Sequence, residues 1–352
     1  MLKVILHLII PNAVLLWITI TGQTGILLTV PSVHITVFFL RISFTVLTMN
    51  LNVLLNYFSG RKQMDLLNEC HAYFRDTKFF NRTGTNASFR GARIALAIFL
   101  LHHTNYELNQ YTYVILYDEK WPEFTFYVVY YFIEMITVMI ALYYDAVLDV
   151  LRIGVRLDCA LLSKCLDQTE LKNDSGNFDD SYWWRTIEYF YNRMLAGHSR
   201  RSAYNRAFRL QLVTIALNTF IVSFSIFYVN MNSILVNAHE GWMEKYKRVT
   251  ESLGFFSHLG AMLLVCHQAT ELECEQRCLV RLIVEAQSKL TKRASNMKRG
   301  DMINSRIMII QHEIKISPYD LFEFDMEFFF GMIAAIVTYL VVLLQFRGLE
   351  PS

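Results

Sequence analysis

The sequence predicts an all-helical membrane protein with seven transmembrane helices in a single domain that covers residues 1–352. Apolar residue types make up 54% of the chain and charged types 18%, whereas soluble domains hold about 25% charged residues. The charges are also segregated, because long stretches that almost lack them alternate with dense basic blocks. This hydrophobicity excludes a disordered chain. The net charge of +2 argues against a nucleic-acid partner.

Seven segments are long and apolar enough to cross a membrane, which requires about 20 apolar residues for about 30 Å of hydrocarbon. Pro11 and the Thr21–Gly25 run interrupt the first segment, and the third is polar in its middle. That third segment must face protein or a water-filled cavity rather than lipid. The predicted spans are 3–30, 33–58, 92–117, 124–148, 208–235, 252–270 and 322–346.

The basic residues predict the orientation, because cytosolic loops carry an excess of Lys and Arg. Seven Lys and Arg residues lie in loop 59–91, counting Arg93 at its edge. Loops 149–207 and 271–321 hold nine each, and Lys3 brings the total on this face to 26. The other face holds five. The N-terminus and the long loops are therefore expected in the cytosol, and the C-terminus outside the cell.

Three other classes fit the sequence less well. A G-protein-coupled receptor has the opposite orientation and relies on prolines in its later spans, whereas spans two to seven contain none. A secondary transporter would have repeated halves and broken helices, and neither is evident. A signal peptide over residues 1–25 would need a small-residue cleavage site, which does not follow that segment.

The long loops are predicted to be helical extensions of the spans. Apolar residues recur every three or four positions in 149–166, 271–290 and 302–316, as on one face of a helix. Lys298–Asp301 is predicted as the turn before the third of these helices, and Ser317-Pro318 as its end.

The chain is not expected to be an enzyme or to bind a cofactor or a metal. No Gly-rich phosphate loop and no nucleophile elbow is present. His267, Cys274 and Cys278 are scattered partly around a helix and lack a fourth ligand. All six cysteines fall in cytosolic loops or a span, so no extracellular disulfide is expected.

The last span ends on a motif with four fixed positions: Thr338 and Tyr339, five apolar residues, then Gln345 and Phe346. This motif resembles the signature of the insect gustatory receptors. Two stretches upstream are also similar to that family's entry into its last helix: Phe322–Asp325 and Phe330–Met332. Members of that family usually have a cytosolic tail before the first span, which here begins near residue 3.

The resemblance implies a ligand-gated, non-selective cation channel in the plasma membrane of sensory neurons. Four subunits, identical or mixed with other gustatory receptors, would surround one central pore and respond to a small-molecule tastant. The cytosolic helix extensions would form the anchor that holds the subunits together. Leu340 stands where the sugar-sensing members carry Glu, which favours bitter or other contact cues over sugars.

One small and weakly polar face of the last span is predicted to line the pore. A helical period places on it Gly331, Ala334 or Ala335, Thr338, Val341 or Val342, and Gln345. Of the two alternatives at each ambiguous position we select Ala335 and Val342, and Phe346 joins Gln345 at the outer end. Small residues also allow close helix packing without any pore, which is the alternative interpretation of this face.

The candidate ligand pocket combines buried charge with aromatic side chains in the outer halves of the spans. Charged residues at membrane depth tend to be paired or functional, and Arg41 lies at a depth similar to Glu107 and Glu134. One of these two carboxylates is the expected partner of Arg41. The pocket residues are predicted to be Tyr113, Tyr127, Tyr130, Glu107 and Arg41. An aromatic belt at the membrane interface is the alternative for the tyrosines.

The predicted orientation can be tested on intact cells. An epitope tag added after Ser352 should be stained without permeabilisation, and Asn81, Asn86 and Asn173 should carry no glycan although each begins an Asn-x-Ser/Thr triplet. A glycan at any of the three would reverse the assignment of its loop.

Overall fold

The described chain is all-helical, as predicted. The computed structural model describes residue 12 and residues 32–78, 90–116, 121–173, 180–236, 242–291 and 315–347. These residues form six long helices and one short 3-10 helix: α3 (Ser32–Lys78), α4 (Arg90–Leu116), α5 (Trp121–Asn173), α6 (Asp180–Val236), α7 (Trp242–Thr291), η1 (Pro318–Asp320) and α9 (Met326–Arg347).

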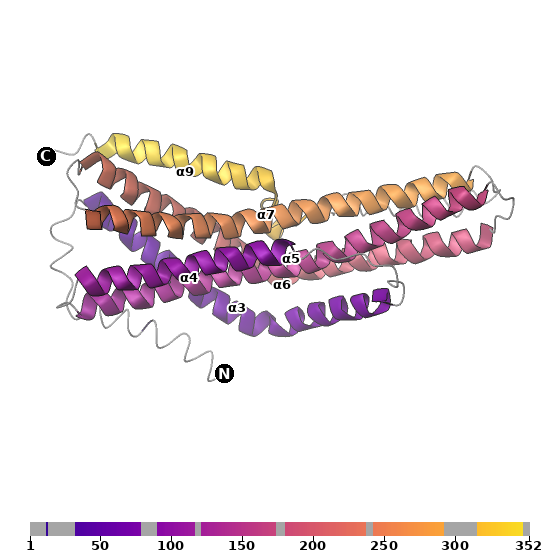
Figure 1. Ribbon diagram of the computed structural model, residues 1–352, viewed down its shortest axis with the longest axis horizontal. Coiled ribbons are helices and arrows are strands. Elements are labelled where there is room, and N and C mark those ends of the chain that lie inside the picture. Colours follow the sequence, from indigo (N-terminus) through magenta and orange to yellow (C-terminus); the bar gives the residue numbers. More distant parts are fainter. Residues whose placement is uncertain are drawn as a thin grey trace.

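Three helices run the whole length of an elongated molecule (Figure 1). They are α5, α6 and α7, whereas α4 and α9 lie along only one half of it. We call that part the wide half. The narrow half consists of residues 149–173 of α5, 180–207 of α6 and 271–291 of α7, with the C-terminal part of α3 beside them. At 1.5 Å per residue, the 57 residues of α6 span about 85 Å, almost three times the thickness of a membrane's hydrocarbon core.

Six of the seven predicted spans lie on described helices, and 3–30 lies outside the described residues apart from Asn12. The Asn12 amide exchanges hydrogen bonds of 3.0 and 3.1 Å with the Asn50 amide of α3. By length and composition, three stretches of the described helices are able to cross a membrane: Ser181–Met231, Arg248–Ser288 and Met326–Gln345.

The last helix begins four residues later than predicted. Residues 322–325 are not helical, and α9 begins at Met326. Asp325 sets this start, because its Oδ1 accepts a 2.7 Å hydrogen bond from the Phe328 backbone N–H and so satisfies an amide that the helix leaves unpaired. Upstream, Tyr319 and Asp320 have φ values of 59° and 56°, which turn the chain sharply into this segment.

The predicted extensions are confirmed where the structure describes them. Segment 149–166 continues α5 to Asn173, and segment 271–290 continues α7 to Thr291. Residues 180–207 likewise form one helix with span 208–235. Most of 302–316 and the whole 298–301 turn lie outside the described residues.

One apolar core runs along the three long helices through the narrow half and into the wide half, from Val138 to Leu166 of α5, from Trp183 to Ala216 of α6 and from Ala261 to Ala286 of α7. In the narrow half it is built from Leu162 of α5, Ile187 of α6 and Ile283 of α7, which are all fully buried. Burying one such side chain stabilises the fold by about 1.5–3 kcal/mol. The stripe of apolar residues seen in each extension is therefore the contact between these helices, and the narrow half is a packed bundle.

A polar clamp ties α3 to α5 and α6 in the narrow half. The Tyr73 hydroxyl donates to the Gly154 carbonyl oxygen, at 2.7 Å, and to the Asp158 carboxylate. Arg193 Nε donates to the same carboxylate at 2.6 Å, and its guanidinium lies 4.1 Å from the centre of the Tyr73 ring. Burial raises the pKa of the Asp158 carboxyl, and the Arg193 guanidinium offsets part of that rise.

The clamp predicts that Gly154→Ala destabilises the protein. A Cβ at Gly154 would lie 2.8 Å from Tyr73 Cε1. The guanidiniums of Arg193 and Arg200 hold the Tyr73 ring, at 4.1 and 3.9 Å from its centre. We expect overpacking to lower the free energy of unfolding by about 1–3 kcal/mol, seen as a lower thermal midpoint of the detergent-solubilised chain. Gly60→Ala is the matched control, because a Cβ there meets nothing within 4 Å; equal midpoints for the two variants would contradict the prediction.

Candidate functional site

A buried ion pair joins α3 to α5 in the wide half. Arg41 donates to Glu134 Oε1 through Nη2 at 2.7 Å and through Nε at 3.2 Å. The Tyr130 hydroxyl donates to the same oxygen at 2.5 Å, and its ring lies 5.3 Å from the Arg41 guanidinium carbon. Arg41 is 8% exposed and Glu134 1%. The structure therefore selects Glu134 over Glu107 as the partner of Arg41.

Two buried histidines lie beside this pair. His102 of α4 and His258 of α7 meet edge to face with ring centres 5.7 Å apart, and both interact electrostatically with Glu134. His102 Nδ1 and His258 Nε2 have no hydrogen-bond partner within the described residues. Four helices thus bring a carboxylate, a guanidinium, a phenol and two imidazoles together inside the wide half.

Only part of the polar middle of α4 faces protein in the single chain. His102 and Asn105 are buried, whereas His103 and Glu107 are exposed in the single chain. Our sequence analysis did not single out His258. The signal for it was present, because an ionisable residue within an apolar span is a site candidate by default.

The predicted pocket residues divide into three groups. Arg41 and Tyr130 lie together in the buried cluster. Glu107 is exposed and does not belong to it. The side chains of Tyr113 and Tyr127 lie outside the described residues.

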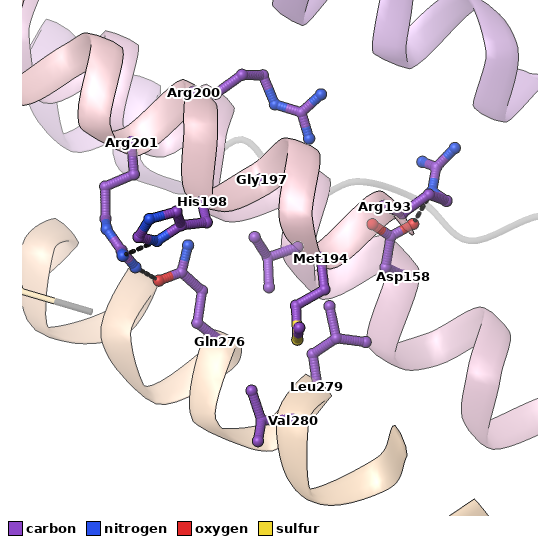
Figure 2. A pocket seen from close by; sticks show the side chains of 11 residues that line it. Asp158, Arg193, Met194, Gly197, His198, Arg200, Arg201, Gln276, Leu279 and Val280 are labelled. Carbon is purple, nitrogen blue, oxygen red and sulfur yellow. Dashed lines mark hydrogen bonds and ion pairs between the residues drawn. The ribbon is translucent and has the colours of Figure 1, made fainter. Parts of the chain in front are cut away.

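A small cavity in the narrow half is too small for an organic ligand. Figure 2 shows it between α5, α6 and α7, with Asp158, Arg193 and Gln276 in its wall. Its free volume is about 10 Å³, which is room for at most one water molecule. Arg201 closes one side, where it donates to Gln276 Oε1 and contacts His198 Nδ1 at 2.8 Å. This cavity belongs to the packing of the bundle.

Two wider grooves also lie along α6. One, of about 460 Å³, lies against residues 315–323, and the other, of about 530 Å³, lies against the C-terminal part of α3. Both grooves lie in or next to the narrow half, whereas the Arg41–Glu134 pair lies in the wide half. Neither groove is lined by a residue of the predicted pocket.

Among the described residues, the last helix packs on its neighbours through one face. Phe329, Met332, Ile336 and Leu340 are buried. The opposite face is exposed, and a Cβ added at Gly331 would meet no atom within 4 Å. The residues on that face are Phe330, Gly331, Ala334, Val337, Thr338, Val341, Val342 and Gln345.

Four of the six predicted pore residues lie on this exposed face: Gly331, Thr338, Val342 and Gln345. Ala335 is half-buried on the flank of the helix and Ala334 is exposed, so Ala334 takes the place that we assigned to Ala335. The helical period left these neighbours open, and the packing decides between them. The Phe346 side chain lies outside the described residues. Tyr339 is largely exposed, with its ring edge-on to Phe220 of α6 at 6.3 Å.

Comparison with known proteins gives a family and a fold. The sequence model of the 7tm chemosensory receptor family matches residues 3–349. The solved structure of the insect olfactory receptor OR5 from Machilis hrabei is similar, with a TM-score of 0.57 at 11% identity over 98% of this chain and 88% of that one. The same receptor in complex with eugenol matches with a TM-score of 0.46 at 14% identity over the same shares. No curated protein sequence matches the chain.

The buried ion pair generates a testable prediction. Arg41→Ala leaves Glu134 charged and unpaired, which costs roughly 3–5 kcal/mol and should reduce surface delivery and thermal stability. Adding Glu134→Gln should recover part of both losses, because it removes the orphaned charge. Glu107→Gln is the control, since Glu107 is exposed, and should behave as the wild type. Normal surface levels and stability for Arg41→Ala alone would show that the pair contributes little.

Proposed function

The chain belongs to the 7tm chemosensory receptor family, and we propose that within it the protein is a gustatory receptor, a ligand-gated and non-selective cation channel built from four subunits. The Thr338-Tyr339 and Gln345-Phe346 motif supports the gustatory branch. Leu340 supports a bitter or other contact cue as the ligand. The subunits, identical or mixed with other gustatory receptors, lie in the plasma membrane of sensory neurons with the C-terminus outside the cell.

The observation that carries the channel proposal is the contrast between the two faces of α9. Only 22% of its apolar stretch is buried within the chain, against 67% of that in α6. The free face carries the small or weakly polar residues Gly331, Ala334, Thr338 and Gln345 among the apolar side chains of Phe330, Val337, Val341 and Val342. Four copies of this face around one axis form a pore wall, in which a ring of Gln345 amides hydrates passing cations.

The buried cluster supports a ligand site in the wide half. Small-molecule sites combine apolar and aromatic walls with a few convergent polar groups. Tyr130 and the Arg41–Glu134 pair supply such groups, and the free imidazole nitrogens of His102 and His258 can hydrogen-bond a ligand. Tyr113 and Tyr127 complete the aromatic wall in this proposal.

A short path links the proposed ligand site to the proposed pore. Arg41 lies one helical turn from Val37 on α3, and Val37 packs in one apolar cluster with Tyr228 of α6 and Leu340 of α9. A ligand that shifts α3 would therefore displace a contact on which the packed face of α9 rests. We propose that this contact transmits ligand binding to the pore.

The pore assignment predicts which positions on α9 water can reach. A cysteine introduced by Gln345→Cys should react with a cationic, water-soluble thiol reagent applied outside, and the reaction should alter the ligand-evoked current. Leu340→Cys is the matched control, because Leu340 is buried against Val37 and should be protected. Reaction at both positions, or at neither, would contradict this orientation of the helix.

Charge substitutions separate a pore from simple helix packing. Gln345→Lys in a homotetramer puts four positive charges in one ring and should suppress cation current. Gln345→Glu should keep the pore open and favour divalent cations. Unchanged current and selectivity in both variants at normal surface levels would leave the small-residue face as a packing surface.

A further inference from the structure

Two thiols from different helices meet in the narrow half, where the proposed function assigns them no role. Cys159 of α5 is 7% exposed, and its thiol donates to the Glu275 carbonyl oxygen of α7 at 3.3 Å. Cys278 follows Glu275 by three residues. Helical side chains lean toward the N-terminus of their helix, so the Cys278 thiol lies over the turn that Cys159 touches. The buried Cys159 thiol therefore rests against the helical turn of α7 to which Cys278 belongs.

The surroundings of the two thiols differ in a way that suits stepwise oxidation. Cys278 is half-buried, and its sulfur accepts a contact from Arg281 Nη2 at 3.9 Å, so positive charge lies beside the thiol that solvent reaches. Cys159 is enclosed, and burial raises the pKa of its thiol, to which the neighbouring Cys278 adds. An oxidant in solution reaches the half-buried Cys278 before the enclosed Cys159, which makes Cys278 the reactive partner.

We propose that Cys159 and Cys278 form a reversible disulfide that joins α5 to α7 when peroxide reaches the narrow half. The Cys278 thiolate attacks one oxygen of hydrogen peroxide, breaks the O–O bond and becomes a sulfenic acid, and the leaving hydroxide takes up a proton to form water. Cys159 then gives up its proton, attacks the sulfenic sulfur and expels a second water. Two thiols and one peroxide thus yield one disulfide and two waters.

The location matches a regulatory rather than a structural bond. The charge distribution assigns the narrow half to the cytosol, where disulfides are transient and small dithiols or dithiol proteins reduce them. The bond would join the two helices that continue from the wide half into the bundle. The disulfide would therefore prevent α5 from sliding against α7. Any response of the wide half that requires such sliding would be blocked while the bond is present. The inference does not require the chain to be a channel.

The test counts thiols on the full-length chain in detergent micelles. After hydrogen peroxide treatment, denaturation and labelling with a polyethylene-glycol maleimide, the reactive thiols should fall from six to four per chain, and dithiothreitol should restore them. Peptide mass spectrometry under non-reducing conditions should find one cross-linked species that contains Cys159 and Cys278. This measurement needs only the wild-type chain, so a variant that misfolds does not affect it.

Variants identify the order of the two steps. Cys159→Ser should leave Cys278 as a sulfenic acid that dimedone traps, and Cys278→Ser should yield neither disulfide nor dimedone adduct at position 159. Cys274→Ser is the matched control, because Cys274 is exposed one turn away on the same helix, and it should still lose two thiols to peroxide. The absence of the cross-linked peptide at full folding, or a thiol loss that needs Cys274 instead of Cys159, would overturn the proposal.

Discussion

The continuous packing of α5, α6 and α7 is the constraint on which every other element depends. Each of these helices is longer than a membrane is thick, and one core follows them through both halves of the molecule. The apolar residues that cross the membrane and those that form the narrow half are thus parts of one packed surface. A rigid axis of this kind allows α3, α4 and α9 to be attached at the sides, each through a limited contact.

The attachments differ in kind, and the difference matters for function. Polar groups join α3 to α5 at three places: the Arg41–Glu134 pair in the wide half, the hydrogen bond from the Tyr144 hydroxyl to Asn52 Oδ1, and the Tyr73–Asp158 contact in the narrow half. Buried ion pairs add little net stability, because desolvation offsets much of their attraction. They do specify one arrangement, since any other position of α3 would leave a charge unpaired.

The last helix is attached by apolar contact alone over most of its length. Its start is well defined, because Phe322 and Phe328 stack at 4.6 Å and Asp325 caps the first turn. Farther along, one side rests on α3 and α6, while the other is exposed in the part of the chain that the structure describes. A firm start and a one-sided packing surface would allow the distal part to tilt without breaking hydrogen bonds, which suits the proposed transmission of ligand binding to the pore.

The sequence by itself determined the class of the protein and the position of each residue along its helix. Apolar length predicted six segments that lie on described helices, periodicity predicted the extensions of α5 and α7, and the motif from Thr338 to Phe346 pointed to the family. These properties are local, because composition and spacing act through a few neighbouring residues.

Only the tertiary structure decided how each helix is rotated toward its neighbours. Glu107 and Glu134 have similar depths, yet only Glu134 faces Arg41, and Ala334 rather than Ala335 shares the exposed face of α9. The contact between Cys159 and the α7 turn that carries Cys278 has no local signal at all. Rotation about a helix axis and pairing between distant segments follow from the simultaneous packing of all the helices, and no short window of sequence contains that information.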